Sequence, residues 1–166
     1  MAAGPRLRRV LGIDPALVFT GYAVLEAAPG LSVLDVGVIE TSPRAPLDDR
    51  IHVIYDGVWR LLAEHAPEGV ALEGLYAAYT FPRTALLMAH ARGVVCLAAR
   101  QRGVPVVTLA PAEVKRAVSG NGAAGKEQVQ RSVQRLLGLA DAPRPSHVAD
   151  ALALAFTALS RQGIAR

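Results

Sequence analysis

Short apolar runs bounded by turn residues dominate the first part of the chain, and apolar residues at helical spacing dominate the rest. Short bounded runs are typical of strands, and repeats every three or four positions are typical of helices. Three early strands followed by alternating helices and strands predict an α/β protein, with a mixed five-stranded sheet flanked by helices. The predicted strands cover residues 8–13, 20–28, 31–40, 69–73 and 104–109. The predicted helices cover residues 47–65, 84–102, 126–137 and 146–160, and another helix begins at residue 111.

Composition indicates a globular protein. Of the 166 residues, 52% are hydrophobic and 19% are charged, which supports a buried core and excludes a disordered chain. We expect a single domain over residues 1–166, in which residues 1–7 form a flexible tail. Stretches without a charged residue, such as residues 15–25, are about eleven residues long, whereas a membrane-spanning helix needs about twenty. The sequence therefore predicts no membrane segment.

Charge and cysteine content add two expectations. The net charge of +4 favours a polyanionic partner, although many basic proteins do not bind nucleic acid. The single cysteine, Cys96, lies among small apolar residues at helical spacing and has no partner for an internal disulfide. We expect Cys96 in the core of a protein from a reducing cytoplasm.

Three acidic residues interrupt segments that are otherwise apolar. Asp14 follows Val-Leu-Gly-Ile, Glu73 follows Val-Ala-Leu, and Asp150 lies within Val-Ala-Asp-Ala-Leu-Ala. A buried carboxylate is costly unless a partner compensates it, and each acid alone is also compatible with an arginine partner or a helix-capping role. The strands that end in Asp14 and Glu73 are expected to be neighbours. Because a divalent cation relieves repulsion between like charges, the three acids together favour a metal site.

His147 lies three residues before Asp150 in the last predicted helix. With Ser146 as the N-cap, both side chains fall on one face of the first turn, where the helix dipole favours an anion. His147 alone is compatible with an ordinary surface position, but beside three acids a ligand role is favoured. Three carboxylates and one imidazole suit Mg²⁺ or Mn²⁺. Two such ions about 4 Å apart would stabilise the attacking water and the leaving oxygen of a phosphodiester.

Four segments around these residues are similar to a known family. They read GIDPALVFTGYAVLE, ALEGLYAAYTFPRTALLMAHARGVV, PAEVKRAV with GNGAAGKEQVQ, and HVADALALA. In order and spacing, and over nearly the whole chain, they resemble the RuvC-type Holliday-junction resolvases, or crossover junction endodeoxyribonucleases. The resemblance implies an RNase H-like fold and a bacterial, cytoplasmic homodimer that resolves four-way DNA junctions during recombination and repair. It also implies paired, metal-dependent nicks with ligatable ends, and a partner complex that binds junctions and drives branch migration.

The resemblance also assigns roles to individual residues. The family's metal-site positions fall on Asp14, Glu73, His147 and Asp150, which would also be the catalytic residues. Its DNA-contacting positions fall on Tyr76, which would wedge into the opened junction, and on Lys115 and Lys126. Many members carry aspartate at the position of His147, so the preferred metal stays open. The usual glycine after Asp-Pro is Ala16 here, which removes no ligand.

Both lysines of the chain lie near the glycine-rich stretch 120–125. With Lys126 this stretch satisfies G-x-x-x-x-G-K, but Glu127 stands where a P-loop needs Ser or Thr, and no buried strand precedes it. We therefore interpret it as a loop that places Lys126 at a helix N-terminus, which suits a DNA phosphate. Three arginines near the N-terminus are compatible with the same DNA surface or with a solvated tail: Arg6, Arg8 and Arg9.

The two-fold symmetry of a four-way junction predicts a two-fold dimer. The expected contact is the helix over residues 84–102, where Ala85, Ala89, Gly93 and Leu97 share one face, although the same face is compatible with packing on the sheet. Tyr76 is likewise compatible with a half-buried structural role. Two other functions stay open, namely another RNase H-like nuclease and a non-cutting module that binds branched DNA. A sugar-kinase or actin-type ATPase needs two such domains, which 166 residues do not supply.

Overall fold

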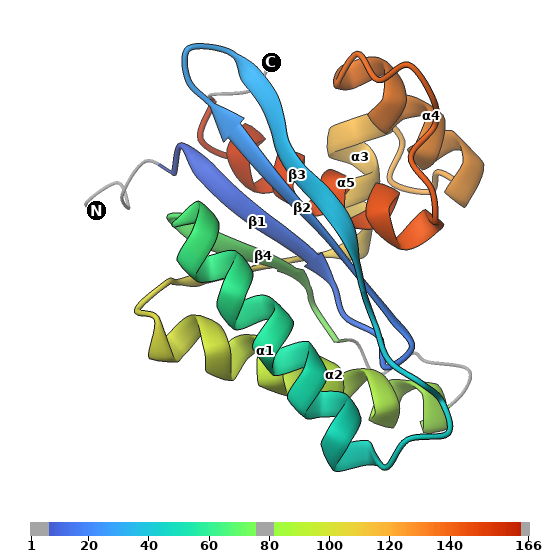
Figure 1. Ribbon diagram of the computed structural model, residues 1–166. Helices are drawn as coiled ribbons and strands as arrows, with labels where there is room; N and C mark the ends of the chain where they lie inside the picture. The colour runs from blue at the N-terminus through green and yellow to red at the C-terminus, as the bar shows by residue number, and fades with distance from the viewer. Residues whose placement is uncertain (1–6, 76–81, 164–166) are drawn as a thin grey trace.

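The computed structural model describes residues 7–75 and 82–163, and its strands form one mixed sheet (Figure 1). The strands are β1 (Arg9–Asp14), β2 (Phe19–Ala27), β3 (Leu31–Glu40), β4 (Gly69–Glu73) and β5 (Val106–Leu109). Their order across the sheet is β3-β2-β1-β4-β5. β1 is central, since it pairs antiparallel with β2 and parallel with β4. β3 pairs antiparallel with β2, and β5 pairs parallel with β4.

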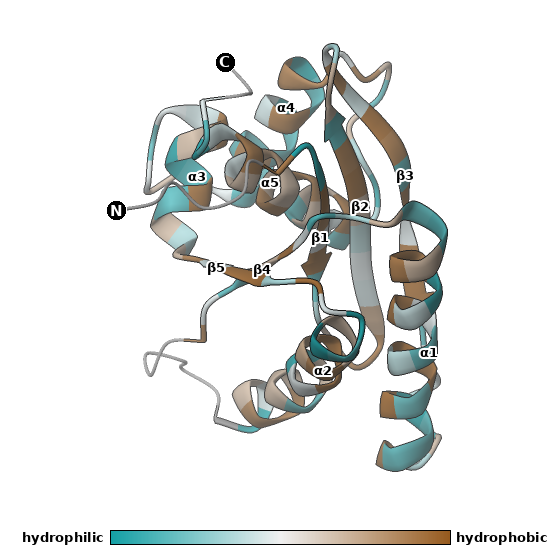
Figure 2. Cartoon of the chain, turned by 90° about the vertical axis from the view of Figure 1, so that its left-hand side faces the viewer, coloured by the Kyte–Doolittle hydropathy of each residue, from teal (hydrophilic) through white to brown (hydrophobic). Residues whose placement is uncertain are grey.

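Helices cover both faces of the sheet. They are α1 (Leu47–His65), α2 (Pro82–Gln101), α3 (Pro111–Ser119), α4 (Lys126–Leu136) and α5 (Ser146–Ser160). α1 and α2 lie together on one face, and α3, α4 and α5 gather on the other (Figures 1 and 2). A separate cluster of buried hydrophobic side chains lies between the sheet and the helices on each face. α1, for example, buries Ile54, Val58 and Leu61, at the spacing of one helix face.

α5 packs directly on β1 and β2 at two glycines. A Cβ added to Gly12 would lie 2.1 Å from the carbonyl oxygen of Ala151, and one added to Gly21 would lie 2.2 Å from the carbonyl oxygen of His147. Both distances are shorter than van der Waals contact, so a side chain at either position would push the helix away from the sheet. The two glycines therefore fix how closely His147 approaches the strands.

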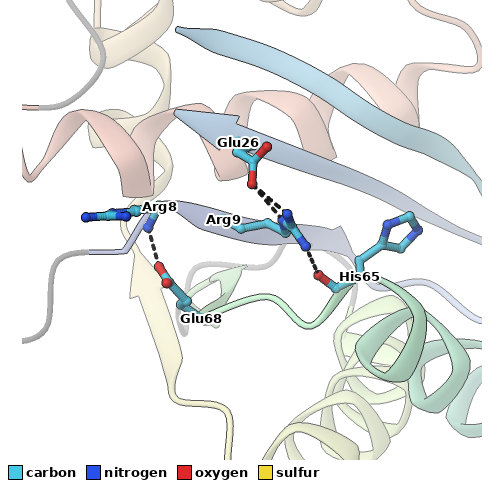
Figure 3. A network of polar contacts seen from close by, with 5 residues as sticks. All are labelled: Arg8, Arg9, Glu26, His65 and Glu68. Carbon is cyan, nitrogen blue, oxygen red and sulfur yellow. Dashed lines mark hydrogen bonds and ion pairs between the residues drawn. The ribbon is translucent and has the colours of Figure 1, made fainter. Parts of the chain in front are cut away.

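The start of β1, at the opposite end of the strand from Asp14, carries a network of opposite charges (Figure 3). The Arg9 guanidinium donates from Nη2 to Oε1 of Glu26 at 2.6 Å and from Nη1 to the carbonyl oxygen of His65 at 2.5 Å. The Arg8 backbone N–H donates to a carboxylate oxygen of Glu68. These contacts connect β1 to β2, to the end of α1 and to the segment before β4. Arg9, which the sequence suggested as a possible DNA contact, is engaged here instead.

The structure confirms the mixed five-stranded sheet flanked by helices. The bounds of β3, α1, β4 and α5 are also those that the pattern predicts. β5 begins two residues later than predicted, at Val106, and β2 begins one residue earlier, at Phe19. The predicted helix over residues 84–102 begins earlier, at Pro82, and ends at Gln101.

Three finer expectations were wrong. Ser146 is the first residue of α5 and not its N-cap; Pro145 takes that position, and no side chain caps the helix. Asp150 is consequently the fifth helical residue, beyond the first turn where the helix dipole acts most strongly. Leu7, placed in a flexible tail, is 5% exposed, and its N–H donates to Oε1 of Gln162 at 2.6 Å. Cys96 is half-buried beside the core on the α2 side and not within it.

No helix in the described part of the chain is both long enough and apolar enough to cross a membrane.

Candidate active site

Asp14 and Glu73 end two neighbouring strands. Ile13 of β1 pairs with Leu72 of β4 in a parallel register, so the next residue of each strand emerges at the same edge of the sheet. Those next residues are Asp14 and Glu73. The expectation that these two acids are neighbours is therefore confirmed.

α5 brings a histidine and a third acid to this edge. The backbone of His147 lies against Gly21, the β2 residue that pairs with Asp14 in the strand register. Nδ1 of His147 lies 2.7 Å from Oδ2 of Asp14 and forms a hydrogen bond with it. Asp150 follows His147 by three residues, close to one helical turn. The close packing of α5 on the glycines thus brings the imidazole to the Asp14 carboxylate.

These side chains line one pocket of about 760 Å³. Lys115 of α3 and Lys126, the first residue of α4, line it as well. The structure therefore brings together six of the seven site residues predicted from the sequence: Asp14, Glu73, His147, Asp150, Lys115 and Lys126. The seventh, Tyr76, lies outside the described residues.

Two of the acids, Glu73 and Asp150, have raised pKa values. Burial raises the pKa of the Glu73 carboxyl, and the negative charges of Asp14 and Asp150 raise it further. Burial and the charge of Asp14 raise the pKa of Asp150 to about 6, although Lys126, His147 and Lys115 oppose this shift. The hydrogen bond to Asp14 raises the pKa of His147. The site therefore concentrates negative charge that its own lysines do not fully compensate.

The donor set suits a hard divalent cation. Carboxylate oxygens with one imidazole are typical ligands of Mg²⁺ or Mn²⁺, and a cation would relieve the repulsion that raises the pKa values of Glu73 and Asp150. Within residues 7–75 and 82–163, however, no three His, Cys, Asp or Glu side chains are placed so that together they could hold a metal ion. The His147 Nδ1 and Asp14 Oδ2 atoms contact each other instead. An ion bound by both residues must either replace this hydrogen bond or bind to the other two atoms, Nε2 of His147 and Oδ1 of Asp14.

Sequence reasoning missed two residues that line the same pocket, Arg50 of α1 and Phe19 of β2. Arg50 follows Asp48 and Asp49 in the first turn of α1, where a charged residue is typical of a solvated surface. Phe19 is 39% exposed, and its ring centroid lies 6.3 Å from that of His147. No local pattern distinguishes either residue, because both reach the site only through tertiary packing.

The sequence matches a known family. The sequence profile of the family described as "Crossover junction endodeoxyribonuclease RuvC" matches residues 10–158, a range that includes the six residues gathered in the pocket. The chain belongs to the RuvC family. The resemblance noted in the sequence is thereby confirmed.

Members of the RuvC family align with nearly the whole chain. RuvC from Rhodopirellula baltica is 46% identical over 146 residues, which make up 87% of this chain and 82% of that protein. RuvC from Nocardioides sp. is 45% identical over 157 residues, or 93% of this chain and 88% of that protein.

Solved structures agree with the family match. Thermus thermophilus RuvC in complex with a Holliday junction substrate superposes with a TM-score of 0.86 at 40% identity, covering 96% of this chain and 98% of that chain. The yeast mitochondrial Holliday junction resolvase superposes with a TM-score of 0.62 at 15% identity, covering 96% of this chain and 80% of that chain, which supports the fold alone. The RNase H-like fold is confirmed, as is the class of structure-specific endonuclease from a metal-dependent family.

Proposed function

We propose that this protein resolves four-way (Holliday) DNA junctions by paired, metal-dependent nicks in homologous recombination and DNA repair. The observation that carries the proposal is the convergence of Asp14, Glu73, His147 and Asp150 in one pocket with two lysines. Three acids retained in one pocket would repel DNA phosphate in a module that only binds DNA. Their retention therefore favours cutting over binding alone.

We propose that Asp14, Glu73, His147 and Asp150 are the metal ligands. Bound Mg²⁺ or Mn²⁺, as a pair of ions, would supply Lewis-acid activation of water and charge stabilisation at the phosphate. Even with its pKa raised to about 6, the Asp150 carboxyl is largely ionised at neutral pH and is therefore available as a ligand. The nick itself joins a water oxygen to phosphorus and breaks the P–O3′ bond, so that a ligase can rejoin the ends.

Lys115 and Lys126 are proposed to hold the DNA backbone. Both line the pocket, and Lys126 is exposed at the start of α4, where the backbone N–H groups of the first turn also favour an anion. The lysines would thus draw phosphate towards acids that would otherwise repel it.

Tyr76 is proposed to stack on a base of the opened junction. Stacking of this kind contributes about 1–3 kcal/mol per base, so Tyr76→Ala should slow cutting far more than it weakens binding. A junction with unpaired bases beside the cut should partly restore the rate of the variant. Equal defects on paired and unpaired junctions would assign Tyr76 a structural role.

A homodimer is proposed to pair the two nicks, with the exposed face of α2 as its contact. Ala89 and Gly93 are exposed and Leu97 is 50% exposed, so this face does not pack on the sheet. A Cβ added to Gly93 meets no atom of the described chain within 4 Å. Gly93→Glu should therefore leave the monomer folded, abolish the dimer in mass measurements and reduce paired nicking to single nicks. A wild-type protein that stays monomeric at micromolar concentration, both free and on a junction, would contradict the dimer.

One assay tests the function directly. The protein is incubated with Mg²⁺ or Mn²⁺ on a synthetic four-way junction, a linear duplex and an RNA–DNA hybrid. Symmetric nicks confined to the junction support resolution, preferential cutting of the hybrid supports another RNase H-like nuclease, and binding without cutting supports an inactive module.

From family membership we further propose a bacterial cytoplasmic location and loading by a junction-binding, branch-migration complex.

A further inference from the structure

Arg50 approaches the active-site pocket from the side opposite to the lysines. It belongs to α1, which packs on one face of the sheet, whereas Lys115 and Lys126 belong to α3 and α4 on the other face. Among the described residues that line the pocket, Arg50 is the only arginine. Its side chain is half-buried there. The pocket is therefore flanked by cations on two sides.

Arg50 is held through one edge of its guanidinium. Its Nε donates to Oγ1 of Thr41 at 3.0 Å, and the Thr41 hydroxyl donates to the carbonyl oxygen of Leu17. The Thr41 backbone N–H donates to the carbonyl oxygen of Val18 at 3.0 Å. Thr41 itself is 6% exposed. This chain of hydrogen bonds connects α1 to the loop that directly follows Asp14.

The two Nη groups of Arg50 form no hydrogen bond or ion pair with any described residue. The cations that lower the pKa values of Glu73 and Asp150 are lysines, assisted by His147, and do not include Arg50. A guanidinium with a fixed Nε edge and available Nη groups has the donor geometry that matches two phosphate oxygens. Arg50 thus has the chemistry of a phosphate contact and no partner within the described chain that takes its place.

We propose that Arg50 binds a DNA backbone phosphate adjacent to the cut, on the side of the active site away from Lys115 and Lys126. Thr41 acts as a positioning residue that fixes the guanidinium. The inference rests on the proposed function, since it requires DNA in this pocket. It adds a substrate contact that places the scissile strand between Arg50 on one side and the two lysines on the other.

A phosphate scan tests the contact. Junctions are prepared with a single neutral methylphosphonate at each position around the cut, and their binding without divalent metal and their nicking rates with metal are compared for wild type, Arg50→Ala and Arg60→Ala. Arg60 is the matched control, because it is an exposed arginine of the same helix outside the pocket. At one position, the methylphosphonate should weaken junction binding by wild type and by Arg60→Ala about 10- to 100-fold, as expected for the loss of a charge-assisted hydrogen bond. The same methylphosphonate should cause little further loss in Arg50→Ala.

Two further variants separate contact from folding. Arg50→Lys keeps the charge and should restore part of the phosphate sensitivity, whereas Thr41→Val keeps the guanidinium and should weaken that sensitivity without removing it. If Arg50→Ala responds to every methylphosphonate as wild type does, Arg50 contacts no phosphate and the inference is wrong. Absence of nicking by wild type on an unmodified junction contradicts the proposed function alone, because the binding scan still tests Arg50. Absence of junction binding by wild type overturns both.

Discussion

The two ends of β1 carry charged side chains in opposite arrangements. At its start, Arg9 lies between the Glu26 carboxylate and the His65 carbonyl oxygen, at 2.6 and 2.5 Å (Figure 3). At its end, Asp14 lies beside two further acids, and burial together with repulsion between the carboxylates raises the pKa values of Glu73 and Asp150. One end satisfies its charges within the chain, and the other leaves negative charge for a ligand to neutralise.

This difference separates stability from function along a single strand. Hydrogen-bonded opposite charges stabilise the fold without any ligand, although the net contribution of each contact is modest. Like charges gathered by tertiary packing destabilise the fold until a cation binds, and such sites are where catalysis is expected. Substitutions at the two ends should accordingly change different measurements.

The largest effect is expected from the acidic end. Asp14→Asn, Glu73→Gln or Asp150→Asn should each reduce nicking of a four-way junction by at least about 10³-fold, because each would remove a proposed metal ligand that supports transition-state charge. Junction binding should survive, since none of these carboxylates attracts phosphate. Glu26→Gln, the matched change at the other end of β1, should cut at the wild-type rate. Near-normal cutting by one of the three variants would refute that residue's assignment.

The next effect concerns the pH dependence of stability without metal. The Asp150 pKa rises from its ordinary value of 3.8 to about 6 on folding, so the folded protein binds this proton more tightly than the unfolded chain does. Stability should therefore fall as pH rises between these values, by about 2–3 kcal/mol for this group.

Denaturant unfolding of wild type and Asp150→Asn between pH 4 and 6 measures this contribution. The variant should lose less stability over that range, and adding Mg²⁺ at pH 7 should stabilise wild type more than the variant. Keeping the comparison below pH 6.5 limits the influence of His147, whose raised pKa adds stability that is lost above that value. Equal dependence of stability on pH in the two proteins would show that folding does not raise the pKa of Asp150.

A smaller effect of a different kind is expected at the opposite end. Arg9→Ala removes the contacts with Glu26 and with the end of α1, and should lower the free energy of unfolding by about 1–3 kcal/mol. Cutting per folded molecule should not change. A loss of cutting without a loss of stability would contradict the separation between the two ends.

The smallest expected effect is a change of metal preference. An imidazole nitrogen is a softer ligand than a carboxylate, so Mn²⁺ should support cutting by wild type at least as well as Mg²⁺ does. His147→Asp should shift the ratio of the two activities towards Mg²⁺. An unchanged ratio would place His147 outside the coordination shell and leave its hydrogen bond to Asp14 as its role.

Much of the fold was predictable because its signals are local. Apolar runs that end in an acid marked β1 and β4, and their parallel pairing, expected for central neighbours, brought Asp14 and Glu73 together. Lys126 was predictable for the same reason, since a glycine loop directly precedes it.

One local feature was predicted wrongly, and one feature that depends on tertiary packing was missed. Ser146 looked like an N-cap because of its residue type, yet the backbone places Pro145 there. Arg50 has no local signal of its own, since it follows Asp48 and Asp49 in a charged first turn, and its hydrogen bond to Thr41 forms only when α1 packs beside the end of β3. Sequence patterns identify which side chains need a partner more readily than they identify which partner the fold supplies.

Binding of Mn²⁺ to the protein alone, followed by electron paramagnetic resonance, tests the central claim most directly. Wild type and Glu26→Gln should bind Mn²⁺ with the same affinity. Asp150→Asn should bind it at least an order of magnitude more weakly, since even the outer-shell partners of metal ligands contribute about 10- to 100-fold. Wild-type affinity in Asp150→Asn, or equal losses in Asp150→Asn and Glu26→Gln, would contradict the account of the acidic end of β1 as the metal site.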